Sequence, residues 1–185
     1  MISNHIFLVK IWLIFCVPPT SEQAAELKAV KNQVEDLLTS VETKVEKLRG
    51  KVAFSAALTF NTEYVQAGPS ELNLVFRNII TNVGNAYSSN TGFFTAPVKG
   101  VYFFRFTVAD ILSSRTMYTA LYRNQQRIML LGEYDMDHHI SYLVGGVTLQ
   151  LEAGDWVNLR LPGNQRLYND ESNHCIFSRF LLFTL

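Results

Sequence analysis

The stretch FRNIITNVGNAYSSNTGFFTAPVKGVYFFRF, from Phe76 to Phe106, decides the fold of this chain. In its last part Tyr102, Phe104 and Phe106 stand at every second position, and Phe103 adds a ring to the opposite side. This period of two predicts a β-strand, because successive side chains of a strand point to opposite faces of the sheet. A lone sandwich buries only one face of each sheet. We therefore expect the second apolar face to meet a partner, which predicts an obligate oligomer.

Short strand-like segments continue through the rest of the chain. KVAFSAALTF (Lys51–Phe60) alternates between apolar and polar or small residues, and GVTLQLE (Gly146–Glu152) turns through Gly154 into WVNLRL (Trp156–Leu161). Hydrophobic residues make up 48% of the chain, which is enough for a substantial core. Short strands with Gly, Pro and Asn turns between them predict an all-β sandwich or jelly roll.

The final segment, IFSRFLLFTL, also predicts a strand with two apolar faces. One face would carry Phe177, Leu181, Phe183 and Leu185, and the other would carry Ile176, Phe180 and Leu182. Like the earlier two-faced strand, it favours assembly with other chains, since an uncovered apolar face risks aggregation.

A helix from Ser21 to Arg49 precedes the strands, and Gly50 ends it. The segment has no Gly or Pro, and its apolar residues recur at steps of three and four, with one stutter near Val41. An amphipathic helix packed on its own domain is the alternative. A narrow seam flanked by charges of both signs favours a coiled coil of identical chains. The seam residues are Leu27, Val30, Val34, Leu37, Val41, Val45 and Leu48.

The first 20 residues have the character of a targeting segment. The apolar run Ile11–Val17 follows the positive charge of Lys10 and precedes two prolines, which is the order found in secretory signals. The run is too short to span a bilayer, and a retained anchor is the alternative. We expect a secreted protein with no membrane span after cleavage. Its parts would be a signal peptide (1–20), a coiled-coil helix (21–49) and one β domain (50–185).

Cys175 would be the single thiol of the secreted protein, because Cys16 would leave with the signal peptide. One interpretation is a small buried hydrophobe in the final strands, which we favour. The other is a disulfide between chains.

The charge balance and the motifs exclude several classes of function. Lys plus Arg and Asp plus Glu number 16 each, so no net field favours nucleic acid or an acidic membrane. The sequence has no nucleophile elbow, phosphate loop or pair of catalytic carboxylates. We therefore expect no enzyme activity and no cofactor.

Two polar segments, Glu133–His139 and Asn169–His174, are the candidate ligand-binding loops. Their carboxylates, amides and imidazoles suit a sugar, phosphate or protein surface, although a merely solvated loop is the alternative. Carboxylates of this kind bind calcium elsewhere, but no calcium-loop spacing supports a metal site here. The candidate residues are Asp135, Asp137, His138, Asp170 and Glu171.

The spacing of eight residues in the opening stretch resembles the signature of the complement C1q globular-head family, and the likeness covers Lys51–Leu185. It implies a ten-stranded jelly roll, related to the tumour necrosis factor fold, that forms tight trimers, is secreted and is not an enzyme. It also implies that the signature aromatics belong to the core and the trimer seam, and that the Gly and Asn fix the backbone. The eight residues are Phe76, Asn82, Tyr87, Phe94, Gly100, Tyr102, Phe104 and Phe106.

Three departures from the family pattern are informative. The sequence has no Gly-X-Y repeat for a collagen stem, and it lacks the N-terminal cysteine pair by which cerebellins form higher assemblies. Arg179 stands where the family usually has Gly, so the packing of the last strands is expected to differ.

The resemblance implies a homotrimeric recognition protein that binds microbial or cell-surface ligands in innate immunity. An extracellular signalling ligand for a cell-surface receptor, similar to the cerebellin synapse organisers, is the alternative. The short stem and the missing cysteines favour the first.

Overall fold

The computed structural model describes residues 20–49, 51–111, 115–135 and 139–185, without the side chains of residues 46–49 and Asp135. The expected signal peptide lies outside this part, apart from Thr20. The chain divides into two compact units, Met1–Val45 and Glu46–Leu185, and each is described by itself. Within the described ranges, no helix is both long and apolar enough to cross a membrane.

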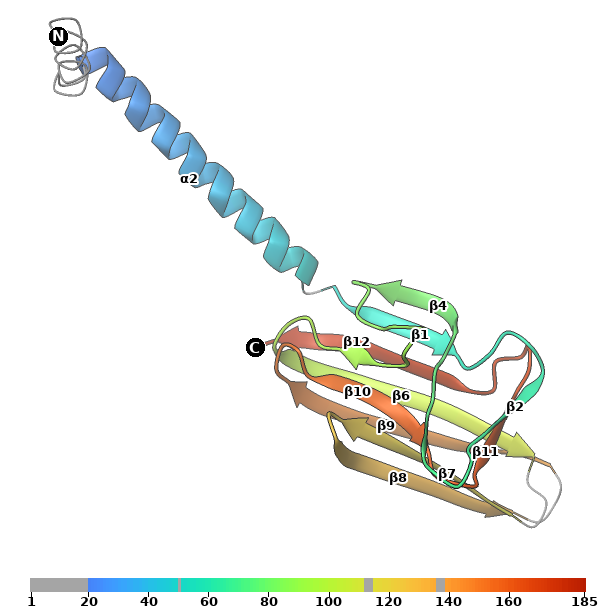
Figure 1. Cartoon of the computed structure of the whole chain (residues 1–185). Coiled ribbons are helices and arrows are strands. Elements are labelled where there is room, and N and C mark those ends of the chain that lie inside the picture. Colours follow the sequence, from blue (N-terminus) through green and yellow to red (C-terminus); the bar gives the residue numbers. More distant parts are fainter. Residues whose placement is uncertain (1–19, 50, 112–114, 136–138) are drawn as a thin grey trace, which may run out of the picture. The chain divides into compact units, whose positions relative to one another are not determined.

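Helix α2 spans Ser21–Arg49, as the sequence predicts (Figure 1). The backbone N–H of Gln23 donates to Thr20 Oγ1 over 3.2 Å, and the backbone N–H of Thr20 donates to Gln23 Oε1 over 3.1 Å. This reciprocal capping box satisfies two donors that a helix start otherwise leaves open. The described seam side chains are exposed, Leu27 by 68% and Val34 by 49%, while the side chain of Leu48 is outside the described part. A single α2 thus leaves its apolar stripe in water, and the coiled coil stays a prediction.

The second unit is a jelly-roll sandwich of two main antiparallel sheets (Figure 1). The first sheet has the order β4 (Asn78–Val83), β1 (Ala53–Ala57), β12 (Ile176–Thr184), β6 (Gly100–Ile111) and β9 (Ile140–Leu151). The second has the order β3 (Leu72–Asn73), β10 (Trp156–Leu161), β7 (Arg115–Arg123) and β8 (Gln126–Asp135), with β5 (Phe94–Thr95) also paired to β10. A smaller sheet joins β11 (Arg166–Asn169) to β2 (Glu63–Gln66). Most neighbours in the sheets are distant in sequence, as a jelly roll requires.

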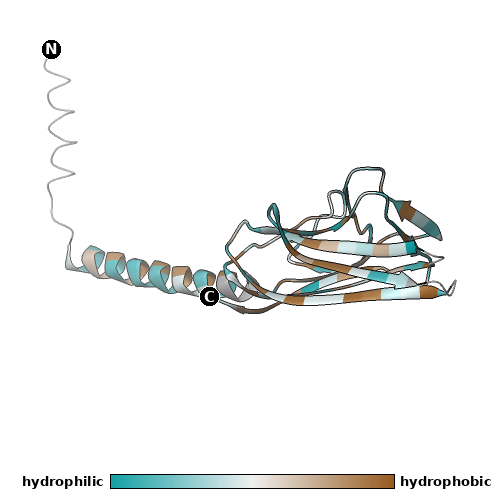
Figure 2. Ribbon diagram, turned by 90° about the horizontal axis from the view of Figure 1, so that it is seen from below, coloured by the Kyte–Doolittle hydropathy of each residue, from teal (hydrophilic) through white to brown (hydrophobic). Residues whose placement is uncertain are grey.

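The six signature aromatics all lie in the core between the sheets. Hydrophobic and hydrophilic residues alternate along the strands (Figure 2). In β6 the side chains of Tyr102, Phe104 and Phe106 are buried while Arg105 is exposed. The remaining three, Phe76, Tyr87 and Phe94, are buried in the same cluster. The period of two in the sequence therefore marks the inward face of β6, and the core role implied by the resemblance agrees with this packing.

The polar atoms of the signature fix the chain between β4 and β5. Tyr87 Oη donates to Phe76 O over 3.1 Å and accepts from Phe76 N over 2.9 Å, and burial raises the pKa of this phenol. The side-chain amide of Asn82 donates to Tyr87 O over 2.9 Å. At Gly100, an added Cβ would lie 2.7 Å from Phe183 O, so only glycine permits the approach of β6 to β12.

The outer face of the first sheet also carries apolar side chains, beside a polar row of Ser55, Ser178 and Arg105. Phe103 pairs directly with Phe180 across β6 and β12, their ring centroids 5.4 Å apart, and Phe180 remains 47% exposed. Val83 and Val144 are exposed on the flanking strands β4 and β9, and the register places them on the same face. We call Val83, Phe103, Val144 and Phe180 the outer apolar face.

The end of β12 differs from the sequence-based expectation. Phe177 is buried and Leu181 half-buried, but Phe183 and Leu185 are exposed rather than continuing that inward face. The reason is a register shift between Leu181 and Phe183 in the ladder with β6, which breaks the alternation.

Arg179 occupies the inward position between Phe177 and Leu181, and its side chain is 1% exposed. Its guanidinium carbon lies 3.9 Å from the ring centroid of Phe94 and 4.2 Å from that of Tyr102. None of its three side-chain nitrogens has a hydrogen-bond partner among the described residues. Burial lowers the pKa of Arg179 to about 9, against the opposing effect of Tyr102, so at neutral pH a cation is held mainly by ring faces.

Replacing Arg179 with Met is expected to leave stability unchanged or raise the free energy of unfolding, by up to about 4 kcal/mol. The change keeps an unbranched side chain in the space but removes a buried charge that lacks hydrogen bonds. Arg179→Ala, the matched control, opens a cavity and should lower stability by about 2–4 kcal/mol. Urea unfolding of the three proteins measures both effects. A Met variant clearly less stable than the natural protein would show that the ring contacts outweigh desolvation.

Cys175 is a free, fully buried thiol. Its sulfur accepts from Ala109 N at 3.3 Å and donates to Tyr168 O at 3.2 Å, and burial raises its pKa to about 12. This environment favours the buried-hydrophobe interpretation over a disulfide between chains.

The Cys175 thiol should therefore resist modification at pH 8 in the folded protein, because both access and thiolate are lacking. With a chain starting at Thr20, which holds no other cysteine, an aromatic disulfide reagent should release chromophore only after denaturant is added. Rapid reaction of the native protein would contradict the buried thiol.

Candidate functional site

The segment Asn169–His174, one of the two candidate loops, is clamped at its base by a buried amide. Asn169 closes β11, and its side-chain NH₂ donates to Thr59 Oγ1 over 3.2 Å and to Thr59 O over 3.3 Å. Its Oδ1 accepts from Cys175 N over 2.9 Å, just before β12 begins. The two ends of the loop are thus tied to each other and to the segment after β1.

Asp170 organises the turn inside this loop. Its carboxylate accepts from Ser172 N at 2.7 Å, from Tyr168 Oη at 3.0 Å and lies 3.1 Å from His174 Nε2. Burial acts to raise the pKa of Asp170, but the hydrogen bonds from Ser172, Tyr168 and His174 together lower it below its usual value. The carboxylate is therefore largely satisfied within the protein.

His174 extends this network to the first sheet. Tyr142 Oη on β9 lies 2.6 Å from His174 Nδ1, so Tyr142, His174, Asp170 and Tyr168 form one hydrogen-bonded chain. Tyr142 is 47% exposed, which puts the outer end of the network at the surface. Sequence reasoning missed Tyr142 and Tyr168 as partners, because 32 residues separate Tyr142 from His174 and no spacing connects them.

Glu171 is exposed, in contrast to Asp170. Its carboxylate accepts one hydrogen bond, from Thr62 Oγ1 over 3.2 Å. Of the predicted residues whose side chains the structure describes, Glu171 is the one that presents a carboxylate outward.

The second candidate loop is described only at its ends. Asp135 ends β8 without a described side chain, and Asp137 and His138 lie outside the described residues. The ladders pair Arg115 with Asp135 and Ile111 with Ile140, so the connection from β8 to β9 leaves from one end of the sandwich (Figure 1). The contact of Tyr142 with His174 brings the other loop to this end.

A metal centre has no support in the described part of the chain, where no three His, Cys, Asp or Glu side chains gather as ligands. What the site offers is hydrogen bonding: an outward carboxylate, a phenol and loop amides on a rigid frame. Such a surface can bind a partner through hydrogen bonds.

Comparison with known proteins agrees with this architecture. Residues 53–182 match the family model of the C1q domain. The chain is 32% identical over 133 residues to "Complement C1q tumor necrosis factor-related protein 3" from both Homo sapiens and Mus musculus. These matches cover 72% of this chain and 52% of each relative, so the chain spans about half the length of the curated relatives it matches.

Solved structures show the same fold at lower identity. "Globular Domain of Zebrafish Complement 1qA protein" matches with a TM-score of 0.58 and 24% identity, over 73% of this chain and 100% of that one. "Structure of Eiger TNF from S. frugiperda" matches with a TM-score of 0.58 and 13% identity, over 74% and 95%. "Crystal structure of murine APRIL at pH 5.0" gives 0.56 and 9%, over 71% and 99%. The family match, the relatives and the fold together show that this chain belongs to the C1q domain family.

Proposed function

We propose that this chain is a secreted, non-enzymatic recognition protein that acts as a homotrimer and binds a microbial or cell-surface ligand through its polar loops. In this proposal the outer apolar face and the seam of α2 serve self-assembly, and the polar loops bind the ligand. It is supported by membership of the C1q domain family and by the name of the relatives, which links them to complement.

The observation that carries the proposal is the outer apolar face of the first sheet. Val83, Phe103, Val144 and Phe180 gather on one side of strands β4, β12, β6 and β9, where water would otherwise meet them. Exposed apolar side chains on one face of a sheet are typical of an interface, and the exposed Arg105 on the same face would lie within it or at its edge. Three copies that turn this face towards a common axis would cover it, and such an arrangement closes into a ring of defined size.

The exposed seam of α2 supports assembly from the other unit. Three heptads are marginal as an isolated coiled coil, so a seam of this length works best when the β domains also associate. Residues Leu27 to Val45 would then join the stem of the same oligomer.

The loops are the proposed ligand-binding surface because their polar side chains suit hydrogen bonding. A trimer would repeat each loop three times, which raises apparent affinity without new contacts. Glu171 and Tyr142 are the described groups with the most outward polar chemistry, and Asp135, Asp137 and His138 remain candidates from the sequence. Asp170 is reassigned to holding the loop in shape.

An extracellular signalling ligand for a cell-surface receptor is the second candidate. The name of the mammalian relatives also includes "tumor necrosis factor-related", which favours this reading of the same architecture. The two candidates differ in ligand, since one expects microbial surfaces and the other a cellular receptor.

Phe180→Asp is expected to split the trimer, because it puts a charge in the centre of the outer apolar face. Sedimentation at micromolar concentration should show a trimer for the natural protein and smaller species for the variant. Phe60→Asp, which changes an exposed Phe outside the named strands, is the matched control and should remain trimeric.

The same proteins test recognition. Labelled trimer, Phe180→Asp and Glu171→Ala are applied to bacterial cells, isolated polysaccharides and animal cell membranes. The Phe180→Asp variant should bind more weakly than the natural protein because avidity is lost. The Glu171→Ala variant should bind more weakly because one contact with the ligand is lost. A natural protein that sediments as a monomer, or that binds none of these surfaces, would overturn the proposal.

Asp170→Asn should lower stability at neutral pH, with a difference that shrinks as the solution is acidified. The pKa of Asp170 is lower in the folded protein than its ordinary value of 3.8, so its carboxylate stabilises the fold above that pH. The stabilisation is lost as pH falls through the lower, folded pKa. Thermal unfolding of both proteins across the acidic range measures this, and a difference independent of pH would contradict the role given to the carboxylate.

A further inference from the structure

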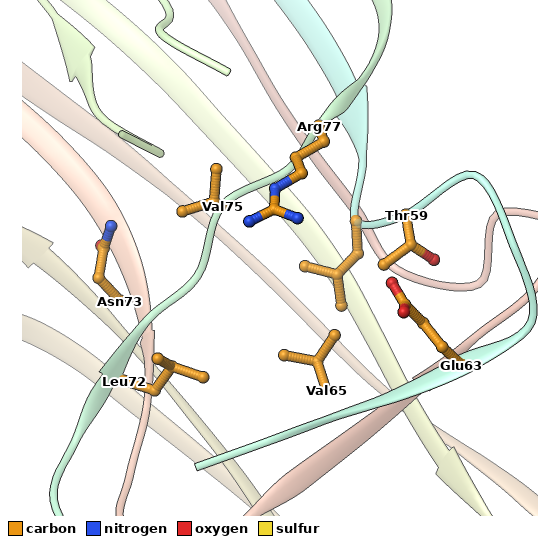
Figure 3. A pocket seen from close by; sticks show the side chains of 8 residues that line it. Thr59, Glu63, Val65, Leu72, Asn73, Val75 and Arg77 are labelled. Atoms are coloured by element: carbon orange, nitrogen blue, oxygen red, sulfur yellow. The ribbon is translucent and has the colours of Figure 1, made fainter. Parts of the chain in front are cut away.

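A cavity of about 300 Å³ lies away from the outer apolar face, between the segment after β1 and the segment from β3 towards β4 (Figure 3). This volume is at the lower end of the range for small-molecule sites. Its apolar wall consists of Leu58, Val65, Leu72 and Val75. Leu58 is buried and the other three are half-buried, so part of this apolar wall remains accessible.

Two of the polar side chains in the cavity are already engaged. Thr59 Oγ1 donates to Asn61 O over 2.8 Å and accepts from Asn169 Nδ2. The amide of Asn73 donates to Thr91 O over 2.5 Å, and its carbonyl oxygen accepts from Asn158 Nδ2. These groups shape the cavity and have little capacity left for a ligand.

Glu63 and Arg77 are different, because neither side chain forms a hydrogen bond or ion pair within the described ranges, with each other or with a neighbour. Both line the cavity and both are exposed. Figure 3 shows the guanidinium of Arg77 extending over the apolar wall and the carboxylate of Glu63 at the side of Thr59. The cavity therefore presents one free cation and one free anion, set apart from each other, with an apolar surface beside them.

We propose that this cavity binds a small zwitterion with an apolar body, of the chemistry of a free apolar amino acid. The ligand's carboxylate meets the guanidinium of Arg77, whose planar fork accommodates two carboxylate oxygens. Its ammonium donates to Glu63, and its side chain covers Val65 and Val75. A ligand with only one of the two charges leaves the other protein charge without a partner, which is the source of selectivity.

This inference goes beyond the proposed function and does not depend on trimer formation or on the ligand-binding loops. The probes are phenylalanine, phenylalaninamide, which lacks the carboxylate, and 3-phenylpropionate, which lacks the ammonium. Calorimetric titration of the full chain should give phenylalanine about tenfold tighter binding than either analogue, as expected for one charged contact.

Protein variants that each lack one proposed charge complete the test, because each variant can be compared with the ligand analogue that lacks the matching charge. Arg77→Gln should weaken the binding of phenylalanine about tenfold and leave the binding of phenylalaninamide unchanged, because that analogue does not use the guanidinium. Glu63→Gln should weaken the binding of phenylalanine and leave the binding of 3-phenylpropionate unchanged. Arg127→Gln, the same change at an exposed Arg on β8, is the control and should leave all three ligands unaffected.

Two outcomes overturn the inference: no binding of phenylalanine up to about 10 mM, where even a weak site would be occupied, or binding that neither Arg77→Gln nor Glu63→Gln alters. Equal melting temperatures confirm that the variants are folded. Either outcome leaves the proposed function standing if the trimer still binds a microbial or cell surface. The failure of this inference and the failure of the proposed function are therefore distinguishable.

Discussion

The packing of aromatic rings between two sheets is the constraint on which the rest of the head depends. Phe177 of β12 contacts Phe54 of β1 edge-on, with ring centroids 5.0 Å apart, and lies 6.1 Å from Phe104 of β6. Phe54 stacks in turn on Tyr87 at 4.3 Å, which ties the loop before β5 to the first sheet. Because each ring has neighbours from strands distant in sequence, the cluster fixes strand order and register together.

That constraint also explains why the surface divides into regions of different chemistry. The inward positions of β6 and β12 are committed to the core, so only their outward positions and the loops are available for interaction. Phe103 and Phe180 place apolar rings at two of these outward positions, whereas the segment after β11 is built from amides, carboxylates and hydroxyls. The sandwich thus holds an apolar sheet face and a polar loop apart, which is the separation on which the proposed function depends.

Much of this could be predicted from the sequence, because it rests on local periodicity. The stretch without Gly or Pro that ends at Gly50 predicted the helix bounds, and the alternation through Tyr102, Phe104 and Phe106 identified the buried face of β6. Arg179 indicated that the last strands would pack differently, but neither the register shift nor the burial of Arg179 against rings could be foreseen, since both depend on contacts with other strands. The contact of Tyr142 with His174 is likewise a product of topology, as is the cavity that both Glu63 and Arg77 line.

The hydrogen-bonded chain from Tyr142 through His174 and Asp170 to Tyr168 has a consequence for the ligand binding that we propose for this loop. A loop that is ordered before contact loses less conformational entropy when a partner arrives than one that must first be arranged. If this loop binds the proposed ligand, its surface would discriminate between partners by shape, since an ordered loop adapts little to a poorly matched one. The internal network would then exchange breadth of recognition for a lower entropic cost of association.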